Sequence, residues 1–253
     1  DFGYKTNKTG FTLGTQFEYY DDFYFGAGIN SYYESIETDS TASAQQKKLK
    51  GNYFDNFINL NFDYDKRNQK FQPSQGFRNY FSTDLPIVSE TNTLANTFIT
   101  TNYFEYFDSN ILKSSFYFRN SNSITGDNIK LSERLYLPSN RLRGFESGKV
   151  GPKDGNDFIG GNYIASLNFS SNVPKILENS QTTDIIIFFD VANVWGVDYD
   201  SALDTSDDIK SAIGLGLDWF SPIGPMNFTL SQHLSKGSND VTESFRFNLG
   251  TTF

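Results

Sequence analysis

Few residues of this chain could drive covalent chemistry. It has no cysteine, which excludes thiol catalysis, thiolate metal sites and disulfides, and its single histidine, His233, has no evident partner for a metal site or a catalytic triad. Carboxylates come in close pairs, Asp63 with Asp65 and Asp207 with Asp208. These pairs fall on expected turns or strand faces, where solvated acids are the ordinary explanation. The sequence therefore predicts a protein that is not an enzyme and that uses no cofactor.

Composition narrows the class further. The formal charge of −9 argues against a nucleic-acid-binding protein, which should carry a basic patch. Hydrophobic residues make up 37% of the chain, and no apolar run approaches the ~20 residues of a membrane-spanning helix. A transmembrane β-barrel escapes such averages, because alternate residues face lipid and lumen. The aromatic content of 17% suits the interfacial girdles of a barrel.

The clearest local pattern lies at the C-terminal end, residues 241–253. A period of two and a terminal aromatic describe a strand with one apolar face that ends at a membrane–water interface. The other face carries polar and small residues. The apolar-face positions are Phe245, Phe247, Leu249, Thr251 and Phe253.

The same alternation recurs along the chain and predicts an all-β, antiparallel up-and-down β-barrel. Residues 1–6 are expected to end a further strand, so the count is about eleven strands and a remnant. Bacterial barrels use even numbers, so either residues 1–6 complete a twelfth strand or, as we favour, strands before Asp1 are missing. No secretory signal opens the sequence, so an exported protein would be represented here by a mature form or an internal piece. The expected strands lie near 10–21, 22–37, 52–66, 76–87, 96–107, 109–125, 159–174, 183–196, 209–221, 225–236 and 240–253.

Loop lengths separate a barrel from a soluble sandwich. Residues 38–51, 127–158 and 197–208 are long and polar, and all three fall on one side if every strand reverses direction. The turns near 20–22 and 221–225 are tight and fall on the other side. Outer-membrane barrels have this layout, with short periplasmic turns and long extracellular loops.

The longest loop contains Arg143-Gly144-Phe145, which by itself is a common surface-loop sequence. Further motifs follow in order: a Gly-Gly-Asn strand start at 160–162, Phe-x-Asp-x-Ala-x-Val-Trp at 188–195, and Ser-Pro-Ile-Gly-Pro at 221–225. Together with the aromatic-ended tail and the Tyr-Asp-Lys-Arg-Asn turn at 64–68, this set resembles the outer-membrane protein assembly factors, the BamA-type barrel insertases. The resemblance covers most of residues 52–253.

That resemblance implies a bacterial outer-membrane β-barrel domain over residues 1–253, the last eleven to twelve strands of a sixteen-stranded barrel. The first strands and the periplasmic POTRA domains would precede it. The resemblance also implies that the loop folds into the lumen, with Arg143 paired to Asp190 on the wall. Gly144 would allow a tight backbone approach, and Phe145 would anchor the tip in an apolar pocket.

Three positions depart from the family pattern. Ala192 replaces a glycine and adds a Cβ where the loop is expected to pack. Asn168 replaces a second acidic residue that supports the arginine; it could accept a hydrogen bond but supplies no charge. His233 stands where the family has proline.

The implied function is insertion of client barrel proteins through a lateral seam, without nucleotide. A glycine near the end of the last strand, Gly250 here, would let that strand kink, or it would merely avoid a clash in the lumen. Phe253 would be the terminal aromatic of the sorting signal. Implied partners are outer-membrane lipids, unfolded clients and accessory lipoproteins, with no nucleic acid. Alternatives are a two-partner-secretion polypeptide transporter and a passive porin-like barrel.

Overall fold

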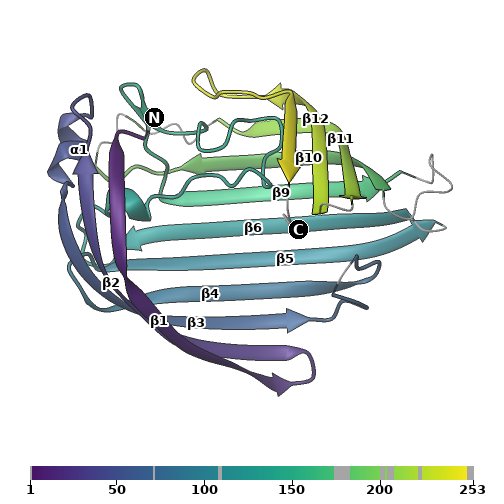
Figure 1. Cartoon of the computed structure of the whole chain (residues 1–253), viewed down its shortest axis with the longest axis horizontal. Helices are drawn as coiled ribbons and strands as arrows, with labels where there is room; N and C mark the ends of the chain where they lie inside the picture. The colour runs from purple at the N-terminus through teal and green to yellow at the C-terminus, as the bar shows by residue number, and fades with distance from the viewer. Residues whose placement is uncertain are drawn as a thin grey trace.

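The computed structural model describes residues 2–70, 72–107, 110–173, 183–199, 203, 208–221 and 224–249. Within them, one curved antiparallel sheet of eleven strands runs in chain order (Figure 1). No helix in the described part is long and apolar enough to cross a bilayer. The strands are β1 (Tyr4–Tyr20), β2 (Phe23–Thr38), β3 (Gly51–Asp65), β4 (Gly76–Ser89), β5 (Thr93–Phe107), β6 (Asn110–Ser123), β9 (Tyr163–Asn172), β10 (Thr183–Trp195), β11 (Lys210–Ser221), β12 (Gly224–Ser235) and β13 (Phe245–Leu249).

Side-chain alternation explains why these segments form strands of a two-faced sheet. In β11, Ile213 and Leu215 point to the convex outer face and are 42% and 51% exposed, whereas Ala212 is fully buried on the inner face. In β10, Ile187 and Phe189 are exposed, and Phe188 and Asp190 between and beside them are buried. An apolar outer face and a mixed inner face are the pattern of a strand between lipid and a lumen. The all-β antiparallel fold predicted from the sequence is therefore confirmed.

The connections follow the predicted sorting by length, with exceptions at both ends. One end of the sheet carries the connections 39–50, 124–162, 196–209 and 236–244, but also the tight turn 90–92. The other end carries the turn 21–22 and the longer connection 66–75. Two of the long connections, 39–50 and 124–162, contain short helices and strands. They are α1 (Ala44–Lys48), a 3-10 turn η1 (Leu131–Glu133), and the two-residue strands β7 (Lys153–Asp154) and β8 (Asp157–Phe158).

Three element boundaries differ from the sequence-based expectation. Tyr4–Thr6 do not end a separate strand but begin β1, which pairs with β2 from Tyr4 opposite Thr38 onward. The start of β1 is rich in polar residues, so no apolar alternation in the sequence indicated a strand there. These side chains find partners on β2, where the Thr6 hydroxyl and Lys8 both contact the Glu34 carboxylate.

The other two differences concern the ends of the long loops. Residues 160–162 belong to the loop, since Gly160 has φ = +68° and β9 starts only at Tyr163. The described part of the last strand spans Phe245–Leu249, while residues 236–244 form a connection that reaches toward the loop.

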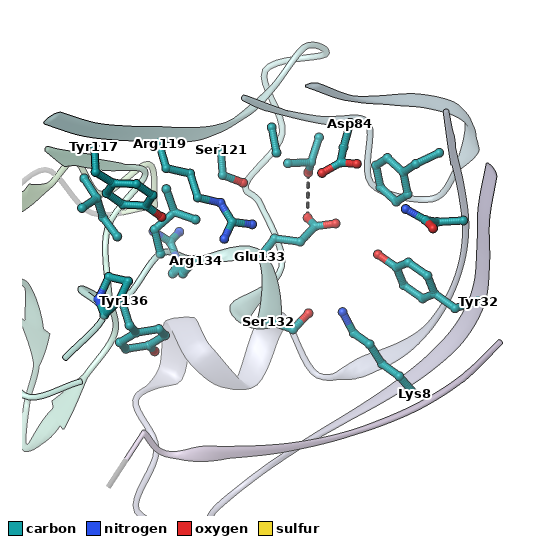
Figure 2. A pocket seen from close by; sticks show the side chains of 17 residues that line it. Lys8, Tyr32, Asp84, Tyr117, Arg119, Ser121, Ser132, Glu133, Arg134 and Tyr136 are labelled. Carbon is teal, nitrogen blue, oxygen red and sulfur yellow. Dashed lines mark hydrogen bonds between the residues drawn. The ribbon is translucent and has the colours of Figure 1, made fainter. Parts of the chain in front are cut away.

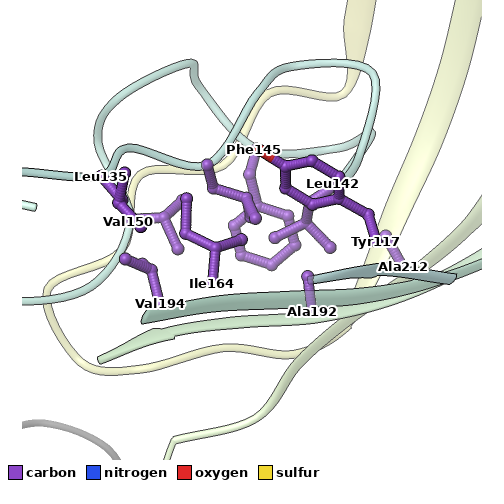
Figure 3. Close-up of a cluster of buried hydrophobic side chains, with 10 residues drawn as sticks. Tyr117, Leu135, Leu142, Phe145, Val150, Ile164, Ala192, Val194 and Ala212 are labelled. Carbon is purple, nitrogen blue, oxygen red and sulfur yellow. The ribbon is translucent and has the colours of Figure 1, made fainter. Parts of the chain in front are cut away.

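The apolar core lies between the β6–β9 connection and the inner face of the sheet, where strand and loop residues interdigitate (Figure 3). We call residues 124–162 the lumen loop, because they lie over the inner face. In Figure 1 this teal segment runs from the side of β2 and α1 toward the yellow β12 and β13. The core residues are Tyr117, Leu135, Leu137, Leu142, Phe145, Val150, Ile164, Ala192, Val194 and Ala212.

Candidate functional site

The structure brings Arg143 of the lumen loop against Asp190 of β10. The guanidinium group donates from Nε to Oδ2 at 2.8 Å and from Nη2 to Oδ1 at 2.8 Å, and the Arg143 backbone N–H donates to Oδ2 at 3.0 Å. Asp190 is fully buried, and the Arg143 side chain is 19% exposed. A bidentate pair of this kind fixes both distance and orientation, so it holds the loop at one position on the wall.

An aromatic ring of the same strand lies against this pair. The Arg143 guanidinium lies 3.6 Å from the centre of the Phe188 ring, two positions before Asp190 on the same inner face of β10. An aromatic face attracts a cation in a place with little water. Removing either charge would leave the other buried without its partner, which is the costly case for a buried ion pair.

Asn168 of β9 accepts a hydrogen bond, as expected, and in addition donates two. It donates from Nδ2 to Asp190 Oδ1 at 2.9 Å and to the Arg141 carbonyl at 2.8 Å, and it accepts from the Ser166 hydroxyl at 3.0 Å. Asn168 therefore supports the carboxylate and the loop backbone as a donor. An aspartate in this place would face Asp190 with a like charge.

Gly144 occupies a position that glycine alone fits. Its φ is +90°, in the left-handed region that L side chains rarely adopt. A Cβ there would also lie 3.2 Å from the Cβ atoms of Ala212 in β11 and Ser231 in β12. The glycine thus lets the loop backbone lie directly on β11 and β12, the two strands before the last one in the sheet order.

Phe145 and its neighbours join the loop to the segment that leads into β13. Phe145 is 1% exposed within the apolar core, and Ala192 packs in the same cluster with its additional Cβ. Phe145 forms an isolated antiparallel bridge with Thr242. Backbone N–H groups of Glu146 and Glu243 donate to the carbonyls of Val241 and Gly144 at 2.9 and 3.0 Å.

Arg246 is a site residue that sequence reasoning missed. It lies on the inner face of β13, and its guanidinium donates to the backbone carbonyls of Ser139 at 3.0 Å and Phe145 at 2.6 Å. It also pairs with Glu243 at 2.9 Å. The alternation of the tail placed Arg246 on the polar face, but only the fold shows that this face meets the loop.

The predicted seam residues divide into two groups. Phe245, Phe247 and Leu249 point outward from β13 and are 54%, 47% and 60% exposed. Gly250 and Phe253 lie outside the described residues, so their roles stay predictions. The sheet order ends at β1 and β13, and no pairing joins these two strands among the described residues.

Comparison with known proteins gives one consistent family. The Omp85 superfamily domain matches residues 2–253. The outer membrane protein assembly factor BamA of Neorickettsia risticii is 23% identical over 256 residues, which cover 99% of this chain and 34% of that protein. BamA of Neisseria meningitidis serogroup B is 30% identical over 139 residues, which cover 44% of this chain and 17% of that protein. The chain thus spans about a third of the length of the first of these relatives.

A solved structure shows the same fold. The crystal structure of BamA from Haemophilus ducreyi lacking POTRA domains 1-3 superposes with a TM-score of 0.86 at 18% identity, covering 96% of this chain and 54% of that chain. The fold is therefore that of a BamA-type barrel portion, and its location is the bacterial outer membrane. By its fold and its match over residues 2–253, the chain belongs to the Omp85 superfamily.

Proposed function

We propose that this chain is the barrel domain of an outer-membrane assembly factor, which folds and inserts client barrel proteins through a lateral seam without nucleotide. The strongest support comes from the contacts of the lumen loop. The Arg143–Asp190 pair holds this loop on β10. Phe145 joins it to the last strand and the segment that leads into it, through a bridge to Thr242 and a hydrogen bond from Arg246. A passive porin has no need of such a connection between a loop and one particular strand.

The proposed mechanism follows from the physics of a strand edge. A last strand that pairs weakly with the first leaves backbone N–H and C=O groups available, and a client strand can add to that edge. Among the described residues, β13 pairs with β12 opposite Met226 to Leu230, and its other edge pairs with no strand. If the loop holds the inner face of β13, the unpaired edge of β13 keeps one orientation while successive client strands pair with it and leave.

The partners follow from the faces of the sheet. Outer-membrane lipids would contact the apolar outer face, and unfolded client proteins would engage the seam. Periplasmic POTRA domains preceding residues 1–253, and accessory lipoproteins bound to them, belong to the proposal by resemblance to the BamA-type proteins.

The test uses the full-length protein in liposomes, with folding of a reporter barrel as the readout. Arg143→Ala and Asp190→Ala should each reduce reporter insertion, and the double variant should be no worse than the more damaging single one, since both remove the same pair. The matched control is Arg78→Ala. Arg78 makes a bidentate pair with Asp63 at 2.8 and 2.7 Å but contacts no part of the lumen loop by any hydrogen bond or ion pair seen in the described residues.

Two outcomes would contradict the proposal. Additive losses in the double variant would show that the pair does not act as a unit. Export of a single polypeptide without any insertion of the reporter would instead favour the secretion transporter. In the same assay, Gly250→Val should lower insertion if the last strand must kink; unchanged insertion would remove the hinge role of Gly250.

A further inference from the structure

A second cluster of buried charge lies at the N-terminal arm of the lumen loop, around Lys130, which precedes Arg143 in the same loop. Lys130 is fully buried, and its ammonium group contacts three carboxylates. Its Nζ lies 3.1 Å from Glu34 Oε2 of β2 and 3.3 Å from Glu133 Oε1 of η1, and it donates to Asp55 Oδ2 of β3. Glu34 and Asp55 are also fully buried.

Each carboxylate of this cluster has a hydroxyl donor of its own. Thr6 and Ser132 donate to Glu34, Ser89 donates to Asp55, and Thr93 donates to Glu133. Five consecutive strands, β1 to β5, therefore contribute to the cluster. The ring centres of Tyr32 and Tyr53 lie 5.2 Å from the Lys130 ammonium group and complete its surroundings.

The cluster is built around a cation. Burial opposes the charge of Lys130, but Glu133 and Asp55 outweigh burial, and the pKa of Lys130 is raised. For Glu133, burial is the largest effect and raises the pKa of its carboxyl group. In the described ranges, no group of acidic or histidine side chains is arranged to hold a metal ion. Lys130 is the buried positive charge among these carboxylates, and the partly exposed Lys8 adds a second one 3.5 Å from Glu34 Oε1.

Packing around this arm differs from packing around Phe145. A cavity of about 280 Å³ lies beside the cluster, lined among others by Tyr32, Asp84, Arg119 and Glu133 (Figure 2). Figure 2 shows Glu133 on one side of the space and Lys8 with Tyr32 on the other. On this side the loop is attached through polar contacts, whereas Phe145 is enclosed by apolar side chains.

We propose that Lys130 is a second anchor of the lumen loop, which fastens its N-terminal arm to β2 and β3 as Arg143 fastens its central part to β10. The two anchors reach strands at distant positions in the sheet order, β2 and β3 for Lys130 and β10 for Arg143, so the loop connects these two parts of the sheet. Lys130 is a positioning residue. Its consequence rests on the proposed function: a loop held at its N-terminal arm and at its centre keeps the two flanks of the seam at a fixed spacing.

The neighbouring contacts agree with an attachment point. Arg134 donates to Asp198 of the 196–209 connection and to Asn162 Oδ1 at 3.1 Å. The Ile129 N–H donates to Asp198 Oδ2 at 3.0 Å, and the Tyr4 hydroxyl donates to the Leu131 carbonyl at 3.0 Å. This arm is therefore held from several elements, with Ile129, Lys130 and Leu131 all buried.

The test uses the full-length protein in liposomes, with hydrogen–deuterium exchange as the main readout and heat-modifiable electrophoretic mobility as the check of folding. Lys130→Met keeps the length and apolar stem of the side chain and removes the charge. It should raise exchange of residues 124–136 by about tenfold or more and leave residues 139–150 within about threefold of wild type. Lys153→Met is the control, a lysine of the same loop that lies over the Phe158 ring.

A charge-specific rescue separates anchoring from packing. Lys130→Met combined with Asp55→Asn removes one of the carboxylates left without a cation and should restore part of the protection of residues 124–136. A role of Lys130 in packing alone would give no rescue. If Lys130→Met does not fold, Asp55→Asn alone should still raise exchange of residues 124–136 and not of 139–150.

The proposal is overturned if Lys130→Met leaves exchange unchanged, if the double variant is no better protected than the single one, or if Asp55→Asn has no effect in the fallback test. The exchange measurement does not depend on insertion. Raised exchange with unchanged reporter insertion would uphold the anchor and count against the proposed role of the seam.

Discussion

Buried charged residues fix the position of the lumen loop on the sheet. Asp190 and Lys130 are both fully buried charges, and each has its partner on a different segment of the chain. Because an unpaired buried charge costs much more than an exposed one, each pair specifies one arrangement of loop and wall. By contrast, Lys66 and Asp22 pair at 2.8 Å with side chains 39% and 50% exposed, and such a pair contributes little.

Two glycines of the lumen loop, Gly126 and Gly144, have positive φ but different surroundings. Gly144 has φ = +90° and crowded surroundings, while Gly126 has φ = +85° and no atom within 4 Å of the point that a Cβ would occupy. Gly126→Ala should cost only the left-handed conformation, about 1–2 kcal/mol. Gly144→Ala should cost more, since its Cβ would press on Ala212 and Ser231.

The measurement is exchange protection of residues 141–146 together with the denaturation midpoint in liposomes. Equal effects of the two substitutions would show that only backbone strain matters, and that close approach of the loop to β11 and β12 does not.

At the scale of elements, the lumen loop is the piece that connects distant parts of the sheet. Its N-terminal arm contacts β2 and β3, its middle contacts β10, and its backbone pairs with the segment before β13. Sequence periodicity located the strands within a few residues, but it gave no information about these connections. Polar residues such as Lys8 and Lys130 look solvated in the sequence, and their partners lie on other elements.

Arg246 carries the prediction for β13. Arg246→Gln removes two hydrogen bonds from a charged donor to loop carbonyls and should weaken the docking of β13 on the loop by about 2 kcal/mol. Glu243→Gln should have a smaller effect. It removes only the ion pair between Arg246 and the Glu243 carboxylate, and the Glu243 side chain is 29% exposed to water. Hydrogen–deuterium exchange of residues 139–150 and 241–249 measures both. A Glu243→Gln effect as large as that of Arg246→Gln would mean that the ion pair, not the carbonyl contacts, holds the strand.

The sheet as a whole has an apolar outer face and a mixed inner face. The same substitution should therefore change the stability of the barrel by different amounts on the two faces. Leu215 is 51% exposed on the outer face of β11, and Asn59 lies on the inner face of β3 with its Nδ2 2.8 Å from Asp84 Oδ1. Leu215→Arg should destabilise the barrel in a bilayer by about 2–4 kcal/mol, since it exposes a charge to lipid. Asn59→Arg should cost far less, because the new charge would face Asp84.

Urea unfolding in liposomes compares these two variants. A Leu215→Arg variant as stable as Asn59→Arg would contradict the assignment of the outer face to lipid. The comparison also distinguishes a membrane-embedded sheet from one that is exposed to water on both faces, where neither arginine would be costly.

Alternation with period two is a local property that needs no knowledge of distant contacts, so the strands, their two faces and most of the sorting of loop lengths could be predicted from the residues alone. The resemblance also paired Arg143 with Asp190. The folded chain was needed to show that Tyr4–Thr6 extend β1, that Asn168 donates to Asp190, that Arg246 contacts the lumen loop, and that Lys130 of this loop contacts β2 and β3. These contacts join residues that are far apart in the chain, and a buried polar residue cannot be told from a solvated one until its partner is in place.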